Sequence, residues 1–175
     1  MRVAIYGGSF NPPHVGHAMV AAWLVWTEQV DEVWLVPTFH HAFDKPLAPF
    51  ERRLSACAAL AGLIGPRVKV EAIEATLPAP SFTVQTLDAL AARHPGVELR
   101  LVVGADVVPQ LPMWRAWDQI ADRYHPIVVG RAGFGPGDRG PSFPEVSSTE
   151  IRRRLAAGER VDDLVPPVVL AAWRG

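Results

Sequence analysis

The residues best suited to chemistry lie near the N-terminus, in the stretch GGSFNPPHVGH at positions 7–17. Gly7 and Gly8 carry no side chains, so a phosphate could approach their backbone N–H groups closely. His14 and His17 stand three positions apart at the start of an expected helix and therefore share one of its faces. Two imidazole donors beside an anion site suit phosphoryl transfer, in which stabilising the developing negative charge is the main task.

A structural explanation of the same residues is also open. The two glycines could simply form a tight turn, and the two histidines could cap the helix. The stretch is neither a Walker loop, which needs Gly-Lys-Ser/Thr, nor the G-x-G-x-x-G fingerprint of dinucleotide-binding proteins. His14 and His17 have no third ligand at a convincing spacing, so we predict no metal site. The whole arrangement favours a phosphate site over a plain turn.

A second candidate phosphate site opens the C-terminal tail, where the letters read VSSTEIRRRL. Ser147 and Glu150 match a capping box, which could explain both of them. The capping box leaves Ser148, Thr149 and Arg152 unexplained. Backbone N–H groups, hydroxyls and a guanidinium at one helix N-terminus would form a second clamp for a triphosphate. The next two arginines are more simply read as solvated or paired.

Strand and helix patterns alternate along the chain. The expected strands cover residues 2–6, 32–37, 68–71, 99–103 and 126–130. The expected helices cover residues 14–29, 49–63, 82–93 and 116–124. This alternation predicts an α/β fold with a doubly wound, mostly parallel sheet and helices on both faces. The first of these helices is apolar almost all round, so we expect it to be well buried.

Two irregular segments follow expected strands, at residues 38–48 and 131–144. In such sheets ligands bind at the carboxyl ends of strands, so both segments should lie on the binding side. The tail reads as two helices separated by the break at residues 165–167. No domain boundary is evident. We expect a single domain over residues 1–175, with a helical tail from about residue 147.

Composition narrows the class of protein. The chain has 175 residues, of which 49% are hydrophobic and 20% charged, and this excludes an intrinsically disordered chain. A net charge of −1 argues against binding nucleic acid by bulk electrostatics. Cys57 is the single cysteine, so an internal disulfide and a cysteine-only metal site are excluded.

The sequence also bears on the location and assembly of the protein. The longest apolar stretch, residues 18–26, is about half a membrane span, and the N-terminus does not read as a secretory leader. We therefore expect a soluble cytoplasmic protein with no membrane or nucleic-acid partner. The apolar tail, including an exposed Trp173, could support a homo-oligomer, although such tails usually pack onto their own domain.

Several motifs are similar to those of one family. The stretch at residues 7–17 resembles the HxGH signature of the nucleotidyltransferase superfamily, whose members transfer AMP or CMP to a phosphorylated acceptor. The tail motif resembles ISSTxIR of nicotinate-nucleotide adenylyltransferases, with Val146 in place of Ile. Further similar segments, in chain order, are SFTVQTL at 81–87, VGAD at 103–106 with Trp114 after it, RAG at 131–133 with Ala132 in place of Pro, and LVP at 164–166.

The resemblance covers nearly the whole chain and implies a Rossmann-like fold and a definite reaction. The acceptor would be nicotinate mononucleotide, and the donor would be ATP with Mg²⁺. The acceptor phosphate would attack the α-phosphate of ATP in line, without a covalent enzyme intermediate. The products would be deamido-NAD and pyrophosphate, which places the reaction in NAD biosynthesis.

The resemblance also implies a role for particular residues. His14 and His17 would be catalytic, stabilising the charge of the triphosphate. The expected ATP-binding residues are Gly7, Gly8, Ser9, Phe10, Arg131, Ser147, Ser148, Thr149 and Arg152. The expected acceptor-binding residues are Asn11, Lys45, Thr83, Gly104, Asp106 and Trp114. Trp114 would stack on the pyridine ring, although a lone tryptophan is more often a core residue.

One segment departs from the family pattern. Where the family usually has P-x-x-x-P-P-H-K, this chain reads PTFHHAFDKP at residues 37–46. Lys45 is the counterpart of the phosphate-binding lysine, but Asp44 beside it is unexpected because like charges repel. His40 or His41 could supply the missing cation, or both could be plain loop residues. The departure leaves the identity of the acceptor more open than the reaction type.

Three alternatives therefore remain. The same adenylyl transfer could use nicotinamide mononucleotide or phosphopantetheine as acceptor. The chain could instead be a catalytically silent nucleotide-binding module, against which the two histidines speak. A truncated aminoacyl-tRNA synthetase shares an HxGH-type motif, but the chain lacks a KMSKS stretch and an anticodon-binding region.

Overall fold

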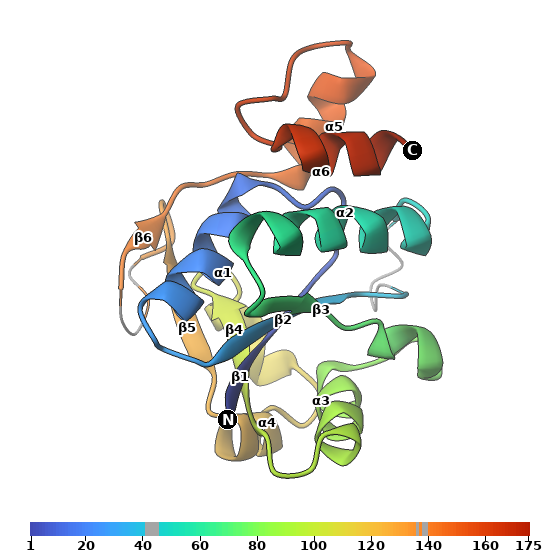
Figure 1. Cartoon of the computed structure of the whole chain (residues 1–175). Coiled ribbons are helices and arrows are strands. Elements are labelled where there is room, and N and C mark those ends of the chain that lie inside the picture. Colours follow the sequence, from blue (N-terminus) through green and yellow to red (C-terminus); the bar gives the residue numbers. More distant parts are fainter. Residues whose placement is uncertain (41–45, 136, 138–139) are drawn as a thin grey trace.

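The computed structural model describes residues 1–40, 46–135, 137 and 140–175. Within these residues the chain forms a six-stranded sheet in the order β3-β2-β1-β4-β5-β6, with every neighbouring pair parallel (Figure 1). The strands are β1 Arg2–Gly8, β2 Glu32–Pro37, β3 Val68–Val70, β4 Glu98–Gly104, β5 Ile127–Arg131 and β6 Ser142–Phe143. The predicted Rossmann-like α/β fold with a parallel, doubly wound sheet is confirmed.

Helices cover both faces of the sheet. Those of the described chain are α1 Val15–Trp26, α2 Phe50–Ile64, α3 Thr83–Arg93, α4 Trp117–Tyr124, α5 Ser148–Ala156 and α6 Pro167–Arg174, with the 3₁₀ turns η1 Ile73–Thr76 and η2 Val108–Met113. Figure 1 places α1 and α2 on one face and α3 and α4 on the other. Successive strand residues point to opposite faces, so Val3 and Ile5 join the core under α3 and α4, whereas Ala4 joins the core under α1 and α2.

Two expectations about local structure are corrected. β6, η1 and η2 were not predicted, because segments of two to six residues are too short to show a periodic pattern. The first helix, which we expected to be well buried, has two exposed apolar side chains. Trp26 and Met19 are 67% and 42% exposed, because α1 lies on the outside of the sheet and only its face through Val20 and Leu24 meets the core.

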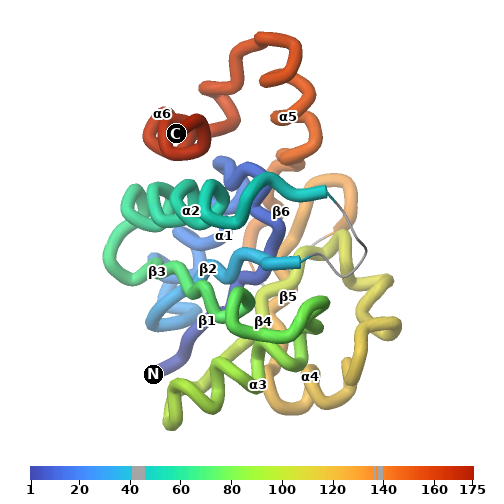
Figure 2. The backbone as a smooth tube through the Cα atoms, turned by 90° about the vertical axis from the view of Figure 1, so that its right-hand side faces the viewer, coloured from blue at the N-terminus to red at the C-terminus, as the bar shows by residue number. Residues whose placement is uncertain are grey.

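The tail forms the two predicted helices, and it packs back onto the domain. Figure 2 shows α6 lying beside α2, and Trp173 of α6 is only 8% exposed. The expected exposure of Trp173 is therefore wrong, because α6 packs against α2 and the ring joins the core cluster there, with Arg52 of α2 lying 5.9 Å from the ring centroid. Self-association of the tail stays a prediction. Among the described residues, none of the helices is both long and apolar enough to cross a membrane.

The topology fixes where a ligand can enter. β1 pairs with β2 on one side and β4 on the other, so the chain changes direction across the sheet between β1 and β4. A crevice opens at the carboxyl ends of the strands at such a point. The tail reaches the same edge, where the backbone N–H of Val15 donates to the carbonyl of Leu164 at 2.9 Å.

Candidate active site

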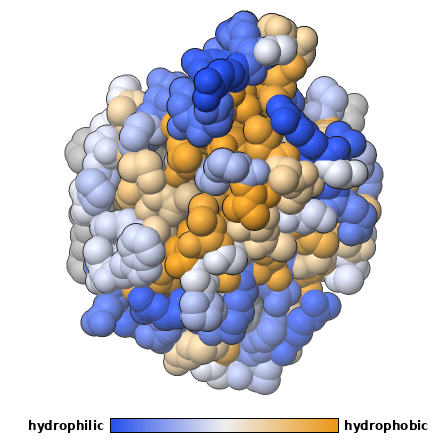
Figure 3. Space-filling model, turned by 45° about the horizontal axis from the view of Figure 1, so that its top comes forward, coloured by the Kyte–Doolittle hydropathy of each residue, from blue (hydrophilic) through white to orange (hydrophobic). Residues whose placement is uncertain are grey.

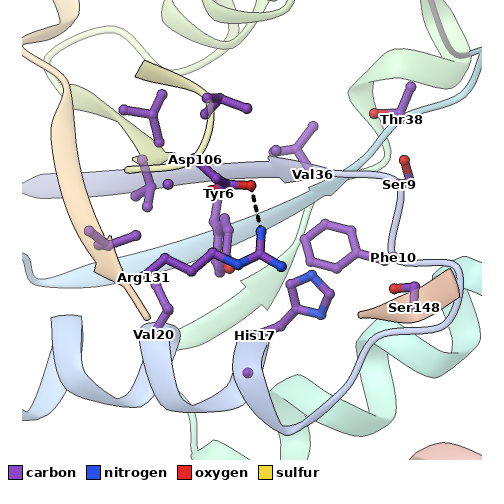
Figure 4. Close-up of a pocket in the computed structure, with 18 of the residues that line it drawn as sticks. Tyr6, Ser9, Phe10, His17, Val20, Val36, Thr38, Asp106, Arg131 and Ser148 are labelled. Carbon is purple, nitrogen blue, oxygen red and sulfur yellow. Dashed lines mark hydrogen bonds and ion pairs between the residues drawn. The ribbon is translucent and has the colours of Figure 1, made fainter. Parts of the chain in front are cut away.

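A pocket of about 570 Å³ lies at this crevice. Its walls come from the ends of β1, β4 and β5, the start of α1, and helices α3 and α5 (Figure 4). Every predicted site residue that the structure describes lines it: Gly7, Gly8, Ser9, Phe10, Asn11, His14, His17, Thr83, Gly104, Asp106, Trp114, Arg131, Ser147, Ser148, Thr149 and Arg152. Lys45 and the departing residues before it lie outside the described residues.

The two glycines at the end of β1 have different roles. A methyl group at Gly7 would meet no protein atom within 4 Å, so it would occupy the space of the pocket itself. A methyl group at Gly8 would come within 3.3 Å of the Phe10 ring. Phe10 is 1% exposed, with a positive φ of 43°, and its ring packs edge-on against His17 at 4.8 Å. Phe10 thus supports the histidine from behind.

His14 and His17 lie together as expected. Their rings stack with centroids 3.8 Å apart, and the backbone N–H of His14 donates to Nδ1 of His17 at 3.2 Å. This bond requires an unprotonated Nδ1, so the proton of a neutral His17 sits on Nε2. His17 therefore presents a hydrogen-bond donor from its Nε2 side while its Nδ1 side holds the start of α1. The structural explanation of this pair, a cap at the start of α1, is confirmed, and its chemical role stays a prediction.

The histidines are held neutral. Burial, with a smaller contribution from the nearby charge of Arg131, lowers the pKa of His14 from 6.5 to about 4. Burial also places the pKa of His17 well below its ordinary value, with contributions from His14 and Arg131. Near neutral pH in the free protein, both rings are therefore dipolar donors and the positive charge of the pocket comes from arginines.

Arg131 lies beside the histidines and is paired with an acid. Its Nη1 donates to Oδ2 of Asp106 at 2.5 Å, as the dashed line in Figure 4 marks. A side chain at Gly104 would collide with Oδ1 of Asp106, so glycine there makes room for this carboxylate. Tyr6 packs at the same place, and its burial raises the pKa of the phenol well above the usual value.

The start of α5 forms the opposite wall. Ser148 Oγ donates to the carbonyl of Pro12 at 2.9 Å, and Arg152 Nη1 donates to the carbonyl of Asn11 at 2.6 Å. Among the described residues no carboxylate pairs with Arg152, so its positive charge is not neutralised. α5 therefore both fastens the loop after β1 and brings an arginine into the pocket.

The predicted capping box at α5 is wrong. Ser147 occupies the N-cap position, but its side chain makes no capping hydrogen bond. Glu150 instead bonds to Arg153 Nε at 2.8 Å and Arg154 Nε at 3.0 Å, and these bonds lower its pKa to about 2. Two arginines at i+3 and i+4 thus outcompete the backbone N–H for the carboxylate. Their expected pairing is confirmed.

The residues predicted to bind the acceptor lie around α3 and η2 and in the loop after β1. Thr83 is the first residue of α3, and Trp114 follows η2 with its ring edge-on to Trp117 at 6.2 Å. Asn11 is 2% exposed, and its Oδ1 accepts a hydrogen bond from the backbone N–H of Ala48 at 3.1 Å. Both the side-chain oxygen and the backbone carbonyl of Asn11 are therefore engaged by the protein itself.

Comparison with known proteins gives the family. The sequence model of the cytidylyltransferase-like family matches residues 5–154. A probable nicotinate-nucleotide adenylyltransferase from Anaeromyxobacter sp. (strain K) is 49% identical over 97% of this chain and 91% of its own length. Another from Myxococcus xanthus is 43% identical over 99% of this chain and 92% of its own length.

The chain belongs to the nicotinate-nucleotide adenylyltransferase family. The resemblance seen in the sequence motifs is confirmed. The nicotinic acid mononucleotide adenylyltransferase of Plasmodium falciparum complexed with NaAD superimposes with a TM-score of 0.76 at 18% identity, covering 98% of this chain and 93% of that one. The same protein complexed with APC gives a TM-score of 0.77 at 17% identity with the same coverage. At these identities the likeness shows the fold.

Two functional candidates in this nicotinate-nucleotide adenylyltransferase were missed by sequence reasoning. Glu74 lines the pocket, where its carboxylate accepts from the Phe39 backbone N–H, Ser81 Oγ and Thr86 Oγ1 at 2.9–3.1 Å. Arg53 lies buried behind the loop after β1. Neither stands in a motif, and only the folded chain brings their partners together. A group of three or more metal-ligating side chains is absent from the described residues.

The contrast between the two glycines gives a first test. Gly7→Ala should leave the melting temperature within about one degree of wild type, because the methyl meets no protein atom. It should raise the Michaelis constant for ATP severalfold, since it fills space that a phosphate needs. Gly8→Ala should instead lower the melting temperature through the Phe10 ring. A Gly7→Ala enzyme with unchanged ATP kinetics would contradict a phosphate site at this glycine.

Acid should weaken the fold through the neutral histidines. Because the folded pKa of His14 is lowered from 6.5 to about 4, the unfolded chain takes up the proton first as the pH falls between these values. The contribution of neutral His14 to the free energy of unfolding is complete above about pH 7. By about pH 5 that free energy should be lower by about 2 kcal/mol because of His14 alone. Denaturant titrations at the two pH values measure the loss. The loss of unfolding free energy should be smaller in the His14→Asn variant. An equal loss in that variant would show that other groups cause it.

Proposed function

We propose that this enzyme transfers AMP from ATP to nicotinate mononucleotide and releases pyrophosphate and deamido-NAD. The observation that carries the proposal is that the two elements predicted to bind phosphate, the loop before α1 and the start of α5, line one pocket together with Thr83 and Trp114. Family membership supports it. The bound NaAD of the Plasmodium falciparum enzyme, which is this product, agrees with it.

The reaction needs positioning and charge stabilisation. An oxygen of the acceptor phosphate attacks the α-phosphorus of ATP in line, and the bond to the bridging oxygen of the leaving pyrophosphate breaks. The acceptor phosphate is already ionised at neutral pH, so the attack requires no general base. Nε2–H of His17 donates to the triphosphate, and Arg152 supplies charge from the opposite wall. Arg131, restrained by Asp106, supplies part of a charge.

Magnesium enters with the donor substrate. Mg²⁺ is usually held by substrate phosphates, water and one or two carboxylates rather than by an all-protein cage. In the described part of the pocket the carboxylates of Asp106 and Glu74 are engaged by protein donors, so the substrate phosphates and water would hold the ion. The chain's own residues then bind the phosphates of the Mg·ATP complex.

The acceptor ring lies toward α3. Trp114 provides an aromatic face for the pyridine ring. Thr83 and the N-terminus of α3 provide donors for the nicotinate carboxylate, since helix N-termini favour anions. Lys45 is expected to contact the acceptor phosphate. These are small-molecule substrates of the cytoplasm, where we expect the enzyme to act.

His17 is the residue on which turnover should depend most. His17→Ala should lower kcat by about 10²–10³-fold, as the loss of one transition-state hydrogen-bond donor typically does. His17→Asn is the matched control for structure, because its Oδ1 can still accept from the His14 N–H while the Nε2 donor is lost. Both variants should be folded and nearly inactive in a pyrophosphate-release assay. Near-normal turnover in folded His17→Asn would remove His17 from the chemistry.

The choice of acceptor separates the remaining alternatives. A site built to bond the nicotinate carboxylate leaves its donors unpaired with the amide, so it should reject nicotinamide mononucleotide. We expect at least about a tenfold preference in kcat/KM, equivalent to about 1.4 kcal/mol. Competition assays with the two mononucleotides measure it. Equal efficiencies would remove the acid-specific assignment, a preference for phosphopantetheine would replace the acceptor, and no turnover with any would favour a silent nucleotide-binding module.

A further inference from the structure

Arg53, in the first turn of α2, is a buried cation outside the pocket. It is 1% exposed and is among the largest fully buried side chains of the described chain. Burying a charge is costly unless its donors are all used. No carboxylate bonds to this guanidinium among the residues described. An arginine on the exposed face of α2 would avoid this desolvation cost. The hydrogen-bond partners of the Arg53 guanidinium must therefore explain why it is buried.

Within the described residues, the hydrogen-bond partners of Arg53 are three backbone carbonyls from three separate segments. Nε donates to Ala48 at 3.0 Å, just before α2. Nη1 donates to Ser9 at 3.0 Å in the loop after β1, and to Thr38 at 2.6 Å just after β2. The rigid planar fork of a guanidinium can hold several acceptors at fixed angles, whereas a lysine ammonium offers a single point on a flexible stem. Arg53 therefore holds three chain segments at set distances.

Two of these segments bracket the acceptor loop. Thr38 and Ala48 stand on either side of Lys45, and both are also bonded to the loop after β1. The Thr38 N–H donates to the Gly8 carbonyl at 2.9 Å, and the Ala48 N–H donates to Asn11 Oδ1 at 3.1 Å. The Arg53 guanidinium bonds to the backbone of Ser9, and Ser9 in turn lines the pocket.

We propose that Arg53 is a positioning residue for the adenylyl transfer, setting the distance between the loop that binds the triphosphate and both ends of the loop that binds the acceptor. It touches neither substrate and acts through the Ser9, Thr38 and Ala48 carbonyls. In-line attack requires the two substrates to be placed within a narrow geometry, and a displacement of about 1 Å can cost 10²-fold in rate. This inference rests on the proposed function, because it assumes two phosphorylated substrates in the pocket.

The test compares two variants at this position with two controls on the same helix. Arg53→Met keeps the apolar volume and removes the fork, and Arg53→Lys keeps the charge with a different geometry. Leu60→Ala makes a cavity in the core at a residue that is 0% exposed and distant from the loops in sequence, so it reports plain destabilisation. Arg52→Met removes the neighbouring arginine, which lies over Trp173.

Initial rates of pyrophosphate release are measured with ATP and nicotinate mononucleotide varied separately, at a temperature where circular dichroism shows every variant folded. Arg53→Met should lower kcat/KM for the acceptor by at least about tenfold. The KM for the acceptor should rise more than the KM for ATP, because two of the three carbonyls flank the acceptor loop. Arg53→Lys should fall between Arg53→Met and wild type, and the two controls should keep wild-type kinetic constants.

Amide hydrogen exchange of the free protein gives a readout that does not depend on turnover. Peptides containing Ser9 and Thr38 should exchange faster in both Arg53 variants than in Leu60→Ala. If Arg53→Met does not fold, Arg53→Lys carries the test. Lower melting temperatures with wild-type kinetic constants and unchanged local exchange would make Arg53 purely structural and overturn the proposal. If the wild-type enzyme is inactive with nicotinate mononucleotide, the proposed function is overturned instead. The amide hydrogen exchange data would then still test whether Arg53 holds the loops in place.

Discussion

The loop after β1, which we propose binds phosphate through its backbone N–H groups, depends on other segments for donors to its carbonyls, and much of the site is built from those segments. Buried carbonyls need donors. Four of these carbonyls are bonded from three segments. The Thr38 N–H donates to Gly8 and Arg53 donates to Ser9, whereas Arg152 and Ser148 of α5 donate to Asn11 and Pro12. The loop is held from behind by segments that are far apart in the sequence, so its shape does not depend on a bound ligand.

Few of the described side chains in the pocket carry an unpaired charge. Two neutral histidines add hydrogen-bond donors without adding charge, which avoids crowding cations in a partly buried site. Asp106 offsets Arg131, while no carboxylate of the described chain pairs with Arg152. The Glu74 carboxylate, which also lines the pocket, accepts hydrogen bonds from one backbone N–H and two hydroxyl groups. Figure 3 shows that apolar residues gather at the centre of the upper face of the molecule, between polar ones.

Much of this arrangement was predictable from the sequence, because the strands and the two main motifs each depend on a short stretch of consecutive residues. The strands carry continuous apolar runs ended by glycine or proline, and the HxGH stretch and the tail motif each lie within about ten consecutive residues. Residues that act through tertiary contacts were not predictable. Arg53 and Glu74 look like ordinary charges on a helix and a turn, and Glu150 has a perfect capping pattern that two nearby arginines override. The departure around Lys45 falls outside the described residues.

The contacts from α5 also determine when the site can exist during synthesis. Ser148 and Arg152 bond to carbonyls that precede them by 136 and 141 residues. A chain emerging from the ribosome completes β1, α1 and their neighbours long before these donors are made. Until then the Asn11 and Pro12 carbonyls lack their partners, and the loop is not fixed in its final shape. The phosphate loop is among the first parts to be translated and among the last to be finished, so a chain that stops before residue 148 would keep most of the sheet without a complete site.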